Sequence, residues 1–366
     1  MSKLRAAVAL LASAGCGYPS LAPLTGDAGS NLVSDGRGGD GPTADAQLCF
    51  GDTTVDVCFA HALDNMILFP SATSIDTDES PMCGTVVQGP DACIVAAGKI
   101  TLDSSATVTA TGSRALVLVA GTTVTIDGTL DVGSYSSGTT GAAADPTTCV
   151  LATSASGAGG GAGGSFGSVG GNGGSDSDGT GGATAASFAS LSLRGGCPGN
   201  SGAGPHPGNG GHGGGAIWIL AGTAIEVSGS IFAPGAGGDN GGSGPTGGCG
   251  GGAGGLVGLD APSVTITATG QVDANGGGGA GGGGVTTEGA DGGNSLSATI
   301  AAAGTAASPD GGGPGGNGSV GSTLGQQGAQ ATSSNGGGGG GGGGAGYVKI
   351  ISTTPTISGA VSPNPT

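Results

Sequence analysis

Few side chains in this sequence have the types and spacing that catalysis requires. The segment from Gly163 to Gly167 has the Gly-x-Ser-x-Gly pattern of a serine nucleophile, with Ser165 at its centre. Such a nucleophile needs a strand before it and a helix after it, but Gly dominates the residues on both sides. The chain also lacks the Gly-Lys-Ser/Thr sequence of a phosphate-binding loop. We therefore expect a protein that is not an enzyme.

Metal ligands are present, but their spacing is unfavourable. Cys197, His206, His212 and Cys249 could be assembled into a zinc site, yet they match none of the usual ligand pairs. The acidic run from Ile75 to Glu79 offers oxygen ligands for Ca²⁺ without the spacing of an EF-hand loop. A solvated turn is the favoured interpretation of this run. No cofactor is predicted, and Ca²⁺ at the acidic run is the alternative.

Basic residues that could abstract a proton from a polysaccharide are scarce. After residue 47 they are Lys99, Arg114, Arg194 and Lys349. Parallel β-helices include polysaccharide lyases, which combine a cluster of carboxylates with a basic residue, and no acidic cluster adjoins these four residues in the sequence of the repeats. A carbohydrate-active β-helix enzyme, a lyase or a hydrolase, is the alternative function. A cleft that gathers Asp residues around Arg114, Arg194 or Lys349 would favour it.

Composition narrows the class of protein further. The chain has 366 residues, of which 92 are Gly, and its formal net charge is −17. Such a surface repels phosphate backbones, so nucleic acid is excluded as a partner. So much Gly would ordinarily indicate disorder, but 36% of the residues are hydrophobic and only 8% are charged, which favours a folded chain.

The N-terminal residues have the features of an export signal. A short basic segment precedes the apolar run from Ala6 to Gly15, so residues 1–15 are interpreted as a signal peptide. The sequence from Ser13 to Cys16 resembles the bacterial lipobox, which implies that Cys16 carries the lipid, and plain export is the alternative. Residues 16–47 hold scattered Pro, Gly and Asp and are predicted to form the lipid anchor and a flexible linker.

Residues 48–97 form a separate cysteine-bearing module. In an exported protein, closely spaced cysteines favour disulfides, and the simplest pairing joins Cys49 to Cys58 and Cys83 to Cys93. The sequence leaves the connectivity open. If Cys16 is lipidated, seven cysteines remain, and the unpaired thiol is one of Cys149, Cys197 and Cys249.

Residues 98–366 contain a repeat. Each copy has an alternating apolar run, an Ala-containing break, a second apolar run, a Gly and a third run, and the copies are Ala115 to Val132, Ala216 to Ala233, Leu256 to Ala274 and Tyr347 to Val361. Short Val-, Ile- and Thr-rich strands at such intervals fit stacked coils better than a sandwich. We predict an all-β fold: a parallel β-solenoid, resembling a right-handed β-helix, whose copies must stack to bury their apolar side chains.

The Gly-rich stretches between the copies have two interpretations. They span residues 157–182, 208–215, 235–255, 276–293 and 311–346. Because Gly loses the most backbone entropy on folding, flexible loops are the default expectation. Gly-rich chains can also form polyproline-II-type helices that pack backbone to backbone, and the direct junction of Gly with apolar strands favours such ordered layers.

Together, the Ser13–Cys16 motif, the Cys49–Cys93 module and the Gly-rich repeats around Trp218 resemble the glycine-rich surface lipoproteins of myxobacterial type, whose composition is PE-PGRS-like. The Gly tracts also resemble the polyglycine-II layers of phage adhesins. The resemblance implies no activity and no functional residue. We predict an exported, lipid-anchored surface or matrix protein, acting as an adhesin or scaffold, whose partner is a polysaccharide or another surface protein.

A third interpretation is a surface that binds ice or mineral. It requires the Thr residues of the repeats to lie in a regular array, namely Thr101, Thr107, Thr125 and Thr265. The irregular spacing of the repeats argues against such an array.

Overall fold

The structure is a computed structural model that describes residues 48–51, 54–136, 138–150, 152–188 and 192–366. These residues form an all-β fold without a helix, and so contain no helix that could cross a membrane. One strand pair is antiparallel and the other pairs are parallel. The predicted signal peptide at 1–15, the predicted lipidation site Cys16 and the predicted linker to residue 47 lie outside the described residues.

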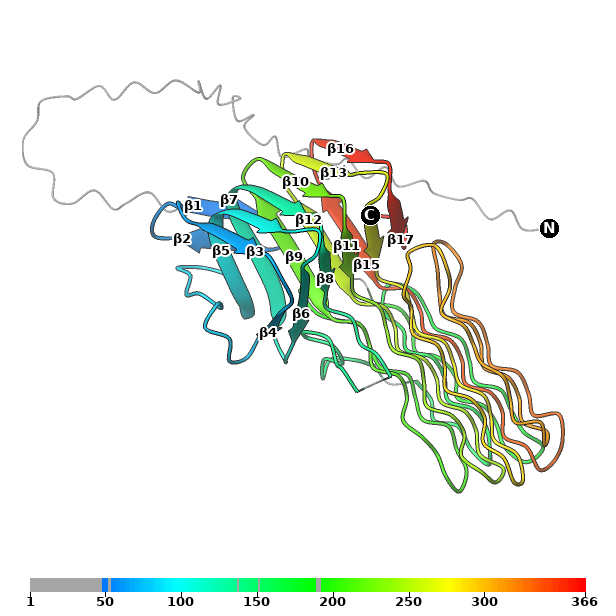
Figure 1. Ribbon diagram of the computed structural model, residues 1–366. Helices are drawn as coiled ribbons and strands as arrows, with labels where there is room; N and C mark the ends of the chain where they lie inside the picture. Colours follow the sequence, from blue (N-terminus) through cyan, green and yellow to red (C-terminus); the bar gives the residue numbers. More distant parts are fainter. Residues whose placement is uncertain (1–47, 52–53, 137, 151, 189–191) are drawn as a thin grey trace, which may run out of the picture. The chain divides into compact units, whose positions relative to one another are not determined.

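The parallel strands come in groups that follow one another along the chain (Figure 1). The first two groups are β3 (Met66–Phe69) with β4 (Thr73–Asp76), and β5 (Ala92–Leu102) with β6 (Thr107–Thr111). The four copies of the sequence pattern form the other groups: β7 (Ala115–Ile126) with β8 (Thr129–Asp131); β9 (Ala216–Ala221), β10 (Ala224–Val227) and β11 (Ser230–Phe232); β12 (Leu256–Asp260), β13 (Ser263–Ile266) and β14 (Gln271–Asp273); β15 (Tyr347–Ile351), β16 (Thr354–Ile357) and β17 (Ala360–Ser362).

Equivalent residues of successive groups lie side by side in the sheets. Val124 of β7 is paired with Ile225 of β10, and Ile225 is paired with Val264 of β13. Because side chains alternate between the two faces of a strand, all three point into the same interior, where none is more than 1% exposed. One hydrophobic core therefore runs through the groups, and each such side chain contributes about 1.5–3 kcal/mol by its burial.

A second apolar layer covers the outer face of β7, β9 and β12. Val117 and Trp218 belong to it, and Trp218 is only 1% exposed. The antiparallel hairpin of β1 (Leu48–Gly51) and β2 (Asp56–Phe59) contributes Phe50 and Phe59 to this layer. Burial on both faces explains why β9 is a continuous apolar run without alternation.

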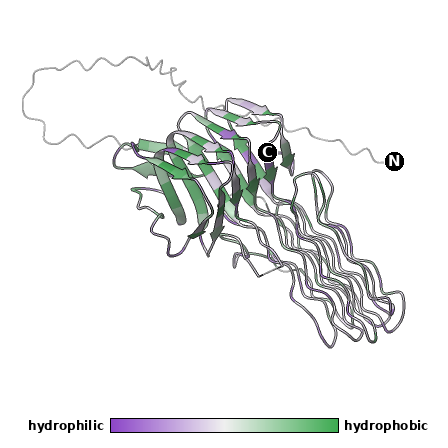
Figure 2. Cartoon of the chain, in the orientation of Figure 1, coloured by the Kyte–Doolittle hydropathy of each residue, from purple (hydrophilic) through white to green (hydrophobic). Residues whose placement is uncertain are grey.

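The long Gly-rich segments all leave the strands at the same point of the pattern. They connect β8 to β9 (residues 132–215), β11 to β12 (233–255) and β14 to β15 (274–346). Figure 1 shows them running side by side away from the strand ends. Figure 2 shows the strands in the green of apolar residues and these segments mostly near white. Residues 158–166, 246–255, 274–284 and 336–346 are buried throughout, so the Gly tracts are ordered and the expectation of flexible loops is wrong.

Backbone hydrogen bonds hold the Gly segments together with a period of three residues. The clearest case is 336–346, whose successive N–H groups point to three different neighbours. Gly337, Gly340 and Gly343 donate to the segment 277–283; Gly338, Gly341 and Gly344 donate to 158–164; Gly339 and Gly342 donate to 326–329. The carbonyl groups of the same stretch accept from three further segments, 171–174, 248–254 and 313–319. Buried backbone groups that would be costly if unpaired are thereby satisfied.

At most positions inside this arrangement, only Gly fits. A Cβ atom on Gly340 would lie 1.9 Å from the carbonyl oxygen of Cys249, and one on Gly341 would lie 2.0 Å from that of Gly171. Such contacts are with backbone atoms, which cannot rotate away. Segment 336–346 is thus enclosed by six neighbouring segments, which leave no room for a Cβ atom at Gly340 or Gly341; Ala345 is the one residue of this segment with a side chain.

The close packing predicts the effect of a single methyl group. Gly340→Ala should lower the free energy of unfolding by about 3 kcal/mol or more, because overpacking against rigid atoms is at the severe end of such substitutions. Gly84→Ala is the matched control, since its Cβ would lie 3.5 Å from the nearest atom, the carbonyl oxygen of Ile94. Chemical denaturation of both variants would measure the difference. Equal stability of the two variants would contradict a close-packed Gly interior.

Candidate functional site

Six cysteines of the described chain form disulfides. Cys49 is joined to Cys58 and Cys83 to Cys93, which are the pairings predicted from their spacing, and Cys149 is joined to Cys197. Of the three cysteines left open by the sequence, Cys249 is the free thiol. It is buried among Gly segments, and burial raises its pKa to about 11, so this thiol is not an active nucleophile.

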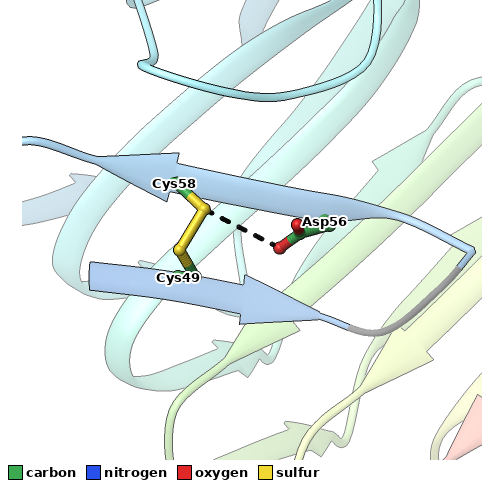
Figure 3. Close-up of side chains that lie close together, drawn as sticks. All are labelled: Cys49, Asp56 and Cys58. Carbon is green, nitrogen blue, oxygen red and sulfur yellow. Dashed lines mark hydrogen bonds between the residues drawn. A yellow bond between two sulfur atoms is a disulfide. The ribbon is translucent and has the colours of Figure 1, made fainter. Parts of the chain in front are cut away.

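Within the described residues, one group of side chains brings its possible ligand atoms as close together as a metal site does, but this group does not form a metal site. Cys49, Asp56 and Cys58 place their ligand atoms within 4.8 Å of one another (Figure 3). Both sulfur atoms are consumed by the disulfide, whereas a metal needs thiolates. Asp56 instead accepts a hydrogen bond of 2.8 Å from Gln88. The group is therefore structural: its disulfide links the two strands of the hairpin.

The acidic run Ile75–Glu79 comprises the end of β4 and the turn at residues 77–79 that follows it. Asp78 accepts hydrogen bonds from the backbone and hydroxyl of Ser113, both at 2.7 Å, and its carboxylate lies 3.6 Å from the guanidinium of Arg114. The Ser113 hydrogen bonds are the main cause that lowers the pKa of Asp78. The cation beside Asp78 is thus Arg114 of the same chain.

The structure does gather carboxylates around basic residues elsewhere. A surface hollow of about 350 Å³ is lined by Asp91, Arg114, Asp145 and Arg194. Ser113 and Thr147 add hydroxyl groups to its wall. This hollow is the strongest candidate functional site, since it combines donors and acceptors of both charges in one concave surface.

Arg194 is held in place by aromatic rings. Its guanidinium carbon lies 5.1 Å from the ring centre of Phe166 and 4.7 Å from that of Phe188, within the range of cation–π attraction. The guanidinium donates to the hydroxyl of Thr148 at 2.8 Å, and its Nε atom is buried without a hydrogen-bond partner. Burial lowers the pKa of Arg194. Its Nη2 atom also donates to the sulfur atoms of Cys149 and Cys197, at 3.6 and 3.1 Å, so the side chain is fixed by several partners, none of which is a carboxylate.

Asp145 links the hollow to His212. Its carboxylate accepts a hydrogen bond from the backbone of Gly213 and lies 2.5 Å from Nδ1 of His212. This hydrogen bond raises the pKa of His212. Asp145 has a φ of 52° and Ala143 a φ of 58°, values that cost about 1–2 kcal/mol in residues other than Gly. The surrounding contacts thus hold a strained turn that aims Asp145 at His212.

Other residues singled out in the sequence do not come together. His206 lies in a turn beside Thr246, apart from the Asp145–His212 pair, and Cys197 is in a disulfide, so no zinc site forms from the described residues. Ser165 is 3% exposed and its hydroxyl accepts a bond from the backbone of Gly170, so it is not an exposed nucleophile. The amino group of Lys349 donates a hydrogen bond to the hydroxyl of Thr54.

The Thr residues of the repeats form only part of an array. Thr101 is paired with Thr125, but Glu226 stands between Thr125 and Thr265 in the same sheet. Thr107 lies in a different sheet, in β6. A regular Thr surface of the kind that ice binding requires is therefore interrupted.

Two carboxylates, the half-buried Asp131 and the buried Asp273, were missed in the sequence. Asp131 accepts a hydrogen bond of 2.9 Å from the hydroxyl of Tyr135. Asp273 is fully buried and accepts bonds from the backbone of Asn275 at 2.8 Å and from Ser295 at 2.9 Å. Burial raises the pKa of both carboxyls, to about 6 for Asp273. Their shared position, the last residue of the third strand of a repeat copy, is a signal that could have revealed them.

Comparisons of the chain with protein-family models, with curated proteins and with solved structures found no match.

The raised pKa of Asp273 predicts a pH-dependent stability. In the folded state the Asp273 carboxyl stays mostly protonated up to about pH 6, whereas its ordinary pKa is 3.8. Protonation of Asp273 therefore adds about 3 kcal/mol to the free energy of unfolding below about pH 4. This stabilisation is lost as the pH rises through 6. Asp273→Asn keeps the shape without the charge. We expect the stability of this variant relative to the unmodified protein to improve by that amount between about pH 4 and pH 7.

Urea denaturation at both pH values would measure this change. Asp64→Asn is the control, because Asp64 is exposed. A relative stability of Asp273→Asn that is the same at both pH values would show that Asp273 ionises as freely in the folded state as in the unfolded chain.

Proposed function

We propose that the chain is a right-handed parallel β-solenoid with polyproline-II-type insertions. Successive groups of parallel strands in matching register support the solenoid. The period of three in the hydrogen bonds of 336–346 supports the insertions, because a polyproline-II helix has three residues per turn. At its rise of 3.1 Å per residue, the ten or so residues on each side of the 233–255 hairpin extend about 30 Å.

We infer that the protein is an exported, lipid-anchored, non-enzymatic surface or matrix protein that serves as an adhesin or scaffold. The observation that carries this proposal is the hydrogen-bonded Gly array, because most of its interior is backbone and offers few side chains to bind or transform a molecule. Its use is mechanical: it holds its turns at a fixed distance from the strands. The three disulfides fit an oxidising compartment.

The turns of the array present a second surface for contact with a partner, apart from the hollow around Arg194. Backbone bonds join neighbouring turns: Ala331 donates to Ser175, Thr332 to Gly311, and Gly244 to Gly284. Asp310 accepts hydrogen bonds from Thr286 and Thr287. A hollow of about 270 Å³ lies between residues 175–177 and 330–334. The turns thus supply a polar surface that could contact a polysaccharide or another surface protein.

A carbohydrate-active enzyme is the second candidate, and one observation favours it. The hollow around Asp91, Arg114, Asp145 and Arg194 is the gathering of carboxylates and basic residues that such an enzyme needs. Against it, Arg114 is bound to Asp78 and Asp145 to His212. Release of unsaturated or reducing ends from polygalacturonate and xylan would separate the two candidates, since an adhesin or scaffold releases none.

The lipid anchor predicts the location of the protein. Cys16→Ala should move the protein from the membrane fraction to the soluble fraction and abolish labelling by a radioactive fatty acid, because stable attachment needs the acyl chains on Cys16. Ser20→Ala is the control and should behave like the unmodified protein. Fractionation and protease treatment of intact cells would measure both location and surface exposure. A Cys16→Ala protein that stays in the membrane fraction would contradict the anchor.

A further inference from the structure

We propose that the hollow around Arg194, together with a second hollow beside it, binds an extended, uncharged carbohydrate chain. The proposal rests on the proposed surface function and names the chemistry of its polysaccharide partner. The place is the junction where the strand groups pass into the Gly array, not the turns of the array. Three features carry the proposal. The first hollow holds a cation and a carboxylate without charged partners among the described residues, the second hollow has an aromatic wall, and the Asp145–His212 pair connects the two hollows.

Among the described residues, the first hollow has one basic and one acidic side chain without an oppositely charged partner. Arg114 is neutralised by Asp78, and Asp145 is bonded to His212. In the described part of the chain Arg194 has no carboxylate partner, and its guanidinium lies over the rings of Phe166 and Phe188. Asp91 is exposed and has neither a hydrogen bond nor an ion pair with the described residues. A hydroxyl group can accept from Arg194 and donate to Asp91, so a molecule rich in hydroxyl groups satisfies both.

The second hollow is also about 350 Å³, and its residues suit a sugar ring. It is lined by Tyr135, Asn209, His212 and Asp239. The Tyr135 hydroxyl donates to Asp131, which fixes the ring as an apolar wall. Gly210, Gly211 and Gly237 form part of the lining, so a ligand can approach the backbone without meeting side chains.

The two hollows meet at one ion pair. Asp145 lines the first and His212 lines the second, and their side-chain atoms are 2.5 Å apart. A ligand that fills both hollows must pass over this pair, which indicates a chain of sugar units instead of a single one. The net charge of −17 opposes a polyanionic chain, so the uncharged class is favoured.

Isothermal titration calorimetry of the full chain tests the proposal with cellohexaose, maltohexaose and mannohexaose as uncharged probes and hexagalacturonate as the anionic one. We expect at least one uncharged hexasaccharide to bind. Asp91→Ala should weaken that binding about tenfold, as expected for the loss of one or two hydrogen bonds. Asp64→Ala is the matched control, an exposed carboxylate outside both hollows, and should bind like the unmodified protein.

A second variant tests the connection of the hollows. The unmodified protein should bind the hexasaccharide more tightly than the corresponding trisaccharide, and Asn209→Ala should reduce this difference. Circular dichroism would confirm that each variant is folded. Absence of binding by all uncharged hexasaccharides at about 1 mM, binding of hexagalacturonate alone, or equal affinity of Asp91→Ala and the unmodified protein would each overturn the proposal. These results leave the surface location untouched, because the Cys16 experiment measures it separately.

Discussion

The rest of the structure depends on the contact between a Gly Cα atom and a neighbouring carbonyl oxygen. Inside the array a Cβ would lie about 2 Å from such an oxygen at nearly every position of 336–346. With side chains excluded, neighbouring segments approach closely enough to pair their backbone groups in several directions. Hydrogen bonds and close backbone packing therefore replace the hydrophobic side chains that stabilise an ordinary core.

The array needs the strand groups, because Gly loses more conformational entropy on folding than any other residue. The strands supply ordinary hydrophobic burial, as in the stacked Val124, Ile225 and Val264. They also fix both ends of each Gly insertion at one corner of the repeat. Each insertion thus begins beside its neighbours, which lowers the entropy cost of bringing the segments together.

The sequence predicted the parts of the fold that leave a local pattern. The short apolar runs in Ala216–Ala233 marked the strands, and close spacing marked the Cys49–Cys58 pair. The sequence did not decide between loops and order in the Gly tracts, because backbone pairing leaves no periodic side-chain signal. The Arg194 hollow was beyond prediction for another reason: the strained turn at Asp145 brings together residues far apart in the chain.

The direction of the hydrogen bonds in the array has a mechanical consequence. The bonds of 336–346 run across the chains to neighbours on all sides, so a pull on one turn along the chain direction loads many of them in shear at once. They must break together, whereas a strand peeled from a sheet edge loses its bonds one after another. The array would therefore resist tension along its length even though each bond contributes only about 1 kcal/mol.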